Sequence, residues 1–263
     1  MILGALGALF GVGLAFASKA FEVKLDPRIA LVREALPGAN CAACGYTGCD
    51  GYAAAVAAGE AAPNLCPVGG RAVAERIAGI MGVEAGAVAK KVARVHCAGR
   101  KGMRKDKYGY VGTKTCAAAA MLHGGPSGCD YGCLGFGDCV KACAFGAMYM
   151  DDGVAAVIAS RCTACGMCAG ACPKKLVTLE AAEAGYTVLC MNKERGALTR
   201  KNCAVGCIGC MRCQKACLVG AARVADNLAS IDQAKCSRCG ECMHLCPQRC
   251  IAYFDCEAAR EEA

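Results

Sequence analysis

Two stretches of the sequence share one spacing of cysteines: CTACGMCAGACP, from Cys162 to Pro173, and CSRCGECMHLCP, from Cys236 to Pro247. In both, two residues separate each of the first three cysteines, three more precede the fourth, and proline follows. This spacing is typical of bacterial ferredoxins, in which three thiolates of a run hold one [4Fe–4S] cube and the fourth binds the neighbouring cube. The two runs therefore predict iron–sulfur clusters.

Two other uses of closely spaced cysteines explain the runs less well. Neighbouring thiols at this spacing would form small strained disulfide rings, and such frameworks belong to short secreted chains. Structural zinc sites usually combine two Cys-x2-Cys pairs that lie far apart in sequence. Soft thiolates suit iron–sulfur clusters, so zinc remains the weaker alternative.

The chain also contains an internal repeat. CDYGCLGFGDCVKACAFGA, from Cys129, aligns without gaps with CAVGCIGCMRCQKACLVGA, from Cys203, at an offset of 74 residues. The two ferredoxin-type runs lie at the same offset, so each copy has the two cysteine runs that one two-cluster ferredoxin module needs. The approach segments VARVHC, ending at Cys97, and YTVLC, ending at Cys190, each predict a short strand.

The crossover rule of two-cluster ferredoxins assigns the ligands. In the second module it predicts one cube on Cys207, Cys210, Cys213 and Cys246 and another on Cys236, Cys239, Cys242 and Cys217; in the first it predicts a cube on Cys162, Cys165, Cys168 and Cys143. The remaining cube has Cys133, Cys139 and Cys172, but Phe136 stands where the second copy has Cys210. Cys129 is the simplest fourth ligand, Cys116 is possible, and a three-iron cluster is the fallback.

A separate cysteine group lies nearer the N-terminus. Cys41, Cys44, Cys49 and Cys66 flank an alanine-rich, helix-prone segment and predict one more cluster, with zinc as the alternative. The predicted cofactors are therefore at least five [4Fe–4S] clusters. Six cysteines stay unassigned, as free buried thiols or as ligands of a further cluster: Cys97, Cys116, Cys190, Cys203, Cys250 and Cys256.

The formal charge of +8 suggests nucleic acid as a partner, but it counts cysteines as neutral. Each [4Fe–4S]2+ core with four thiolates carries −2, so five clusters would bring the loaded protein to about −2. We therefore expect no nucleic-acid partner and a reducing compartment. The basic stretch RKGMRKDKYGYVGTK is either a docking loop for an acidic redox protein or a solvated loop.

The N-terminus runs through 18 uncharged residues before Lys19, and the apolar run extends to Phe21. This length is near that of a transmembrane helix, although a signal peptide is an alternative. Lysine and arginine follow the run, so the positive-inside rule predicts a single-pass protein of the inner (cell) membrane with its C-terminal domains in the cytoplasm.

These patterns together predict an α+β fold. We expect a transmembrane anchor (1–21), a tether (22–36), a small helical [4Fe–4S] domain (37–95) and two tandem two-cluster ferredoxin-like modules (96–185 and 186–263). No Ser/His/Asp arrangement, phosphate loop or nucleotide fingerprint is visible, so no catalytic residue is predicted. The chain itself is expected to carry electrons only.

The order of these motifs resembles one family. LPGANCAACGYTGC with the later CPVGG, GCLGFGDCVKAC, and GCIGCMRCQKAC followed by DNLASIDQAKCSRCGECMHLCP are similar to the B subunit of the Rnf complex, a membrane-bound ferredoxin:NAD oxidoreductase that moves sodium ions or protons. Members of the family often have glycine where this chain has Ala42.

The resemblance implies an electron-transfer subunit that accepts electrons from soluble ferredoxin. Its implied partners are the C subunit, which binds NAD and flavin, and the integral-membrane A, D, E and G subunits. Two alternatives remain at this point: an electron wire of the polyferredoxin type serving another redox enzyme, and a zinc-binding interaction protein that would be colourless and free of iron.

Overall fold

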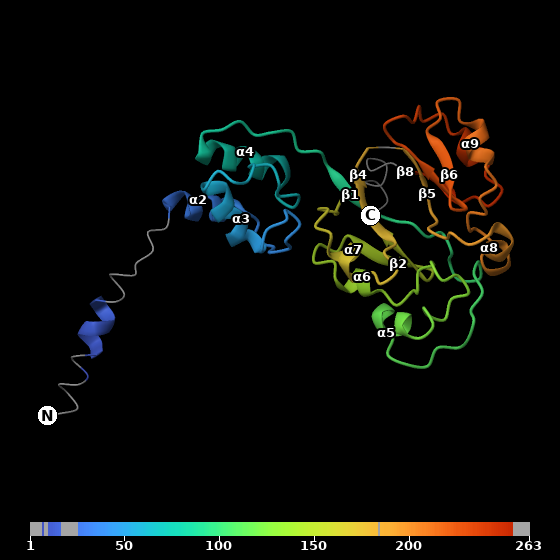
Figure 1. Ribbon diagram of the computed structural model, residues 1–263, viewed down its shortest axis with the longest axis horizontal. Coiled ribbons are helices and arrows are strands. Elements are labelled where there is room, and N and C mark those ends of the chain that lie inside the picture. The colour runs from blue at the N-terminus through green and yellow to red at the C-terminus, as the bar shows by residue number, and fades with distance from the viewer. Residues whose placement is uncertain (1–6, 8–9, 17–25, 184, 255–263) are drawn as a thin grey trace.

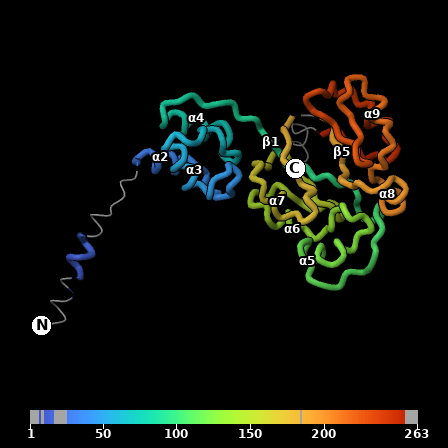
Figure 2. The backbone as a smooth tube through the Cα atoms, viewed as in Figure 1, coloured from blue at the N-terminus to red at the C-terminus, as the bar shows by residue number. Residues whose placement is uncertain are grey.

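The computed structural model describes residues 7, 10–16, 26–183 and 185–254 (Figure 1). A helical unit comes first, and two similar units of short helices and two-stranded sheets follow. Figure 2 shows that a single stretch of chain connects the helical unit to the other two. Most of the fold is therefore small pieces of secondary structure that support long cysteine-bearing loops.

The helical unit contains α2 (Pro27–Ala35), α3 (Gly48–Ala57) and α4 (Gly70–Met81). Asp26 caps α2, because its carboxylate accepts a hydrogen bond from the backbone N–H of Arg28 at 2.8 Å. One face of α4 packs into the core of this unit: Ile77 is fully buried, and Val73 and Ile80 pack against the same core. That core also holds Cys49 and Cys66, so the helices bring distant cysteines together.

Both ferredoxin-like units have the same sheet topology, which confirms the repeat in three dimensions. In the first unit, β1 (Lys91–Val95) pairs with β4 (Val177–Ala181), and β2 (Met148–Asp151) pairs with β3 (Val154–Val157), all antiparallel. In the second, β5 (Gly185–Val188) pairs with β8 (Ile251–Phe254), and β6 (Ala222–Ala225) with β7 (Leu228–Ile231). The strands predicted before Cys97 and Cys190 are thus β1 and β5.

Each cysteine loop leads into a short helix of four or five residues, which precedes the next strand. These helices are α6 (Asp138–Lys141), α7 (Met167–Ala171), α9 (Arg212–Ala216) and α10 (Glu241–His244). Two further helices precede the first loop of each unit: α5 (Cys116–Met121) and α8 (Gly196–Asn202).

A buried group of charges joins the two units. Arg94 on β1 is 3% exposed, and its Nε lies 3.3 Å from Glu180 Oε2 on β4. The guanidinium stacks 4.0 Å above the ring of Phe254 on β8, which belongs to the second unit. His96 reaches both sides: its Nε2 lies 2.9 Å from Glu180 Oε1 and its Nδ1 2.9 Å from the carbonyl oxygen of Val188. The hydrogen bond from His96 holds the pKa of Glu180 below its usual value.

The expected transmembrane anchor is wrong for this structure. No helix among the described residues is long and apolar enough to cross a membrane. Much of the predicted span, residues 1–6, 8–9 and 17–21, lies outside the described residues. The fold class is corrected to a mixed fold of helix and strand with cluster-binding domains and, in the described part of the chain, no transmembrane helix.

Candidate metal centres

The four cysteine loops of the ferredoxin-like units share one backbone conformation. Each has two residues with positive φ, one just before the second position of the cysteine run and one just after it. The pairs are Gly135 and Gly137, Ala164 and Gly166, Gly209 and Met211, and Arg238 and Gly240. Left-handed residues in a tight loop turn backbone N–H groups inward and form a concavity for an anionic group. A thiolate-bound cluster is such a group.

The site predicted from the first full run is assembled as expected. Cys143, Cys162, Cys165 and Cys168 line one space of about 310 Å³. Backbone N–H groups donate to two of the sulfurs, from Ala93 to Cys162 and from Ala147 to Cys143, each at 3.3 Å. Burial raises the pKa of the Cys168 thiol to about 11, and the nearby thiolates of Cys162 and Cys165 add to this. Binding to iron would remove that proton.

In the second unit one predicted set meets in a similar space, with one extra thiol. Cys207, Cys210, Cys213 and Cys246 line about 330 Å³ together with Cys250. The Sγ atoms of Cys246 and Cys250 are 3.6 Å apart, and this contact lowers the pKa of Cys246 to about 5. Cys250 takes the place that Leu176 has in the first unit, at the offset of 74 residues. The surplus thiol therefore occupies a packing position.

The other predicted set of the second unit is Cys217, Cys236, Cys239 and Cys242. Cys217 and Cys242 pack against the same apolar core. The thiolates of Cys236 and Cys239 are close enough to raise the pKa of Cys242, after the larger effect of its burial. Ala222 N–H donates to Cys217 and Arg238 N–H to Cys236, both at 3.4 Å.

A further thiol lies near the incomplete site at Phe136. It belongs to the insertion, the 19 additional residues that the first repeat has between Cys97 and Cys129 compared with Cys190 to Cys203. Burial raises the pKa of Cys139 to about 12, and the neighbouring thiolates of Cys133, Cys172 and Cys116 raise it further. Phe136 packs against the apolar cluster that contains Cys116. Ala117 N–H donates to Asp138 Oδ2 at 3.0 Å, which connects the start of α5 to α6.

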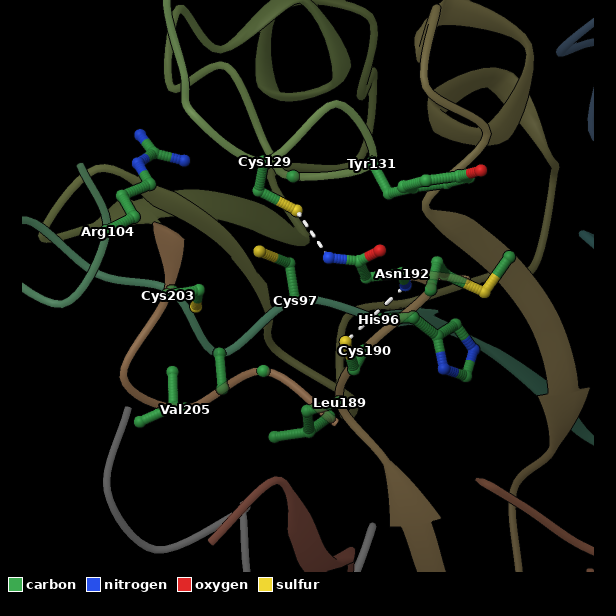
Figure 3. Close-up of a pocket in the computed structure, with 15 residues that line it drawn as sticks. His96, Cys97, Arg104, Cys129, Tyr131, Leu189, Cys190, Asn192, Cys203 and Val205 are labelled. Carbon is green, nitrogen blue, oxygen red and sulfur yellow. Dashed lines mark hydrogen bonds between the residues drawn. The ribbon is translucent and has the colours of Figure 1, made fainter. Parts of the chain in front are cut away.

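Cys129, which the sequence favoured as the fourth ligand of that site, lies in a different group. It lines a space with Cys97, Cys190 and Cys203, and its sulfur accepts a hydrogen bond from Asn192 Nδ2 at 3.5 Å (Figure 3). The structure thus places Cys129 with these three cysteines and Cys116 near Cys139. The reason is the path of the insertion, which carries Cys116 to Phe136 and turns Cys129 toward the second unit.

The N-terminal site combines a loop with a helix. Cys49 and Cys66 are buried in the core of the helical unit, and Cys44 packs against it. Burial raises the pKa of Cys66, and the thiolates of Cys49 and Cys41 add to the effect. Asn40 Oδ1 accepts from Cys49 N–H at 2.9 Å, and Gly69 N–H donates to Cys66 Sγ at 3.4 Å. The four predicted thiols thus surround one end of α3.

Single-ion geometry is a separate question. Within the described part of the chain, no group of three or more histidine, cysteine, aspartate or glutamate side chains lies close enough to hold one metal ion. His123 and His244 are both exposed.

Two family models match the chain at these sites. A model described as "Putative Fe-S cluster" matches residues 36–68, which contain Cys41, Cys44, Cys49 and Cys66. A model described as "4Fe-4S binding domain" matches residues 155–177 and 229–252, which contain the two full ferredoxin runs. The prediction of [4Fe–4S] clusters is confirmed at this level.

Relatives match along almost the whole chain. The B subunit of the Na+-translocating ferredoxin:NAD+ oxidoreductase complex of Acetobacterium woodii is 46% identical over 95% of this chain and 76% of the relative. The B subunit of the ion-translocating oxidoreductase complex of Methanosarcina acetivorans is 43% identical over 95% of both chains. That of the proton-translocating ferredoxin:NAD+ oxidoreductase complex of Clostridium ljungdahlii is 41% identical over 95% of this chain and 90% of the relative. The chain belongs to the family of Rnf B subunits. The resemblance inferred from the cysteine motifs is thereby confirmed.

One departure from the family pattern has a conformational cost. Ala42, where other Rnf B subunits often have glycine, adopts φ = 56° in the first loop. A left-handed conformation costs an L-residue roughly 1 kcal/mol relative to glycine. We expect Ala42→Gly to raise the free energy of unfolding of the helical unit by about 1 kcal/mol, measured by denaturant unfolding of anaerobic protein. Ala43→Gly, at a neighbour without positive φ, is the control and should destabilise slightly.

Proposed function

We propose that this Rnf B subunit carries electrons from reduced ferredoxin, through a chain of [4Fe–4S] clusters, toward the NAD-reducing and membrane subunits of an ion-translocating oxidoreductase. The observation that carries the proposal is that four cysteine loops share one backbone conformation. At two of the sites, the four proposed ligands line a single space. The names of the relatives support the same function.

The proposal assigns five clusters to this chain. Its ligand sets are Cys41, Cys44, Cys49 and Cys66; Cys116, Cys133, Cys139 and Cys172; Cys143, Cys162, Cys165 and Cys168; Cys207, Cys210, Cys213 and Cys246; and Cys217, Cys236, Cys239 and Cys242. The matching division of the chain is a tether (22–36), a helical cluster domain (37–95) and two ferredoxin-like modules (96–185 and 186–263).

When bound, the clusters supply one-electron transfer. The chain's own residues hold each cube by four thiolates, and the N–H···S bonds to Cys162, Cys143, Cys217 and Cys236 stabilise the negative charge on sulfur. Cys210 and Cys239 are exposed. The two cubes of the second module therefore lie where a partner's redox group can approach closely.

The proposed partners are soluble ferredoxin, the C subunit and the integral-membrane A, D, E and G subunits. The cluster domains would work at the cytoplasmic face of the cell membrane as part of that complex. The relatives support this assembly through their names, since each belongs to an ion-translocating oxidoreductase complex.

Metal analysis of protein purified without oxygen tests the proposal. We expect about 20 iron and 20 sulfide per chain or more, and reduction of the iron–sulfur absorbance by reduced ferredoxin. A colourless protein that contains zinc, or an iron–sulfur protein that reduced ferredoxin leaves oxidised, would reject the proposed function.

The basic insertion is the proposed docking site for ferredoxin. Lys101 and Lys105 are exposed, whereas the Arg104 guanidinium donates to the carbonyl oxygens of Cys133 and Gly153. Arg104 is thus a structural residue, and the two lysines are the ones to test. We expect Lys101→Glu with Lys105→Glu to weaken ferredoxin binding roughly tenfold at low salt and less at high salt, because exposed charges are screened.

A matched control uses two exposed lysines at the start of β1, as Lys90→Glu with Lys91→Glu. Binding would be measured by titration at two ionic strengths. Equal effects of the two double variants, or an effect that salt leaves unchanged, would show that the insertion is a solvated loop.

A further inference from the structure

Four cysteines outside the five proposed sites meet at the junction of the two repeats. Cys97 and Cys129 come from the first repeat, and Cys190 and Cys203 from the second. We propose that these four thiolates hold a sixth [4Fe–4S] cluster, which links the two modules. This inference rests on the proposed function for the other five clusters and extends it.

The repeat itself generates the site. Val95 pairs with Val177 and Val188 pairs with Ile251, so β1 and β5 occupy the same place in their sheets. Cys97 follows β1 by two residues and Cys190 follows β5 by two residues. Cys129 and Cys203 are equivalent at the offset of 74 residues. Each repeat therefore contributes the same two cysteines.

The backbone holds the two halves against each other. Ala98 N–H donates to Leu189 O at 3.1 Å, directly beside Cys97 and Cys190. On the other side, Ala204 N–H donates to Met103 O at 2.7 Å, next to Cys203. The four thiols are thus placed by main-chain pairing rather than by flexible loops.

Hydrogen bonds to the sulfurs repeat the same symmetry. Cys133 N–H donates to Cys97 Sγ at 3.5 Å, and the equivalent Cys207 N–H donates to Cys190 Sγ at 3.3 Å. The backbone N–H of Tyr131 interacts with Cys129, and that of its equivalent Val205 with Cys203. Such N–H···S bonds stabilise thiolates and tune the potential of a bound cluster. Buried thiols that bind no cluster would not require such matched pairs of N–H···S bonds.

Glycines bring the main chain close to these sulfurs. A Cβ added to Gly99 would lie 3.6 Å from Cys203 Sγ and 3.7 Å from Cys97 Sγ. A Cβ on Gly132 would lie 3.6 Å from Cys129 Sγ, and one on the equivalent Gly206 would lie 3.7 Å from Cys203 Sγ. The sulfurs therefore share a common space that side chains do not fill.

The lining and charge of that space fit a cube. Four cysteines line it, as four proposed ligands line each of two ferredoxin-type sites. Arg104 lines one edge and buried Asn192 donates to Cys129 at another, as Figure 3 shows. A positive charge and an amide donor both favour a group with a net charge of −2.

The position of the site indicates between which clusters a sixth cluster would transfer electrons. Cys133, which donates to Cys97 Sγ, is a proposed ligand of the Cys116 cube in the first module. Cys207, which donates to Cys190 Sγ, is a proposed ligand of a cube in the second module. The sixth cluster would accept one electron from a reduced cube of one module and pass that electron to an oxidised cube of the other, with ferredoxin as the electron source.

The test is the iron and acid-labile sulfide content of Cys97→Ser/Cys203→Ser in the full chain, purified without oxygen. We expect about 24 iron in the unmodified protein and about 20 in the double variant. Val83→Ser/Val111→Ser is the matched control: it also introduces two serines, at exposed positions away from the cysteine sites, and it should keep about 24 iron.

The outcomes separate this inference from the proposed function. About 20 iron in the unmodified protein, unchanged in the double variant, would overturn the sixth cluster and leave the other five. Loss of one zinc ion rather than four iron atoms from the double variant would overturn it in favour of zinc. A protein without iron would reject the proposed function itself.

If the double variant does not fold, a second measurement, on the unmodified protein, tests the inference. Only Cys250 and Cys256 remain outside the six proposed sets, so about 24 iron in the unmodified protein itself requires this site. Spin counting by electron paramagnetic resonance after full reduction should then give six clusters. Five would overturn the inference.

Discussion

Cys165→Ser should remove about four iron atoms per chain and reduce ferredoxin-driven NAD reduction by the assembled complex to background. Cys165 is one of four thiols that line the site with Cys143, Cys162 and Cys168. A serine hydroxyl is a much poorer ligand than a soft thiolate. Because the clusters are proposed to work in series, the loss of one interrupts the path.

The measurements are iron content and turnover, with Met167→Leu as the control. Met167 lies in the same run of sequence and is 45% exposed, so its replacement should change neither quantity. Cys239→Ser tests the second module in the same way. Unchanged iron and turnover in both serine variants would reject the ligand scheme.

Glu180→Ala should lower the free energy of unfolding of the ferredoxin-like units by about 3 to 5 kcal/mol. The substitution leaves the guanidinium of Arg94, which is 3% exposed, without the carboxylate that lies 3.3 Å away. It also removes the partner of His96, which bridges to Val188 of the second unit. Much of the effect is therefore the loss of the carboxylate that faces a buried guanidinium.

Denaturant unfolding of the anaerobic protein would measure this change, with absorbance of the clusters as a second signal. Glu75→Ala is the control, because Glu75 pairs with Arg71 at 2.6 Å on an exposed helix surface. Such a pair contributes about 0.3 to 0.5 kcal/mol. Equal shifts in the two variants would show that the buried charges do not hold the units together.

The spacing of cysteines predicted the fold better than it predicted every ligand. The runs at Cys162 and Cys236 determine the local conformation of their loops, because ligands two or three residues apart must lie in one turn of the chain. The similar approach segments before Cys97 and Cys190 also identified β1 and β5 as equivalent strands. These features depend on residues that are close together in the sequence, so they can be recognised from the sequence alone.

The role of Cys116 depends on contacts that have no counterpart in the sequence pattern. Cys116 lies in the insertion of the first repeat, where no equivalent residue exists in the second. The insertion reaches the second unit, where Lys105 N–H donates to Asn202 O at 2.9 Å, and returns, where Gly128 N–H donates to Lys105 O at 2.7 Å. That path places Cys116 beside Phe136, although Cys129 is nearer to Phe136 in sequence.

The apolar N-terminal run shows a different limit. A hydropathy criterion averages composition over a window of residues, and a run of 18 uncharged residues meets that criterion. It does not establish that the residues form one continuous helix. Within the residues that the structure describes, no helix is long and apolar enough to cross a membrane.

The strand order also sets a sequence of events during synthesis. Each ferredoxin-like unit is closed by pairing its first strand with its last: β1 with β4, and β5 with β8. Domains generally fold as units while the chain leaves the ribosome, N-terminal parts first. A nascent chain that stops before Ile251 can complete the first unit but not the second, and Phe254 is not yet available to Arg94. A protein that ends before Ile251 would therefore contain a complete first unit and a second unit whose β5 has no partner strand.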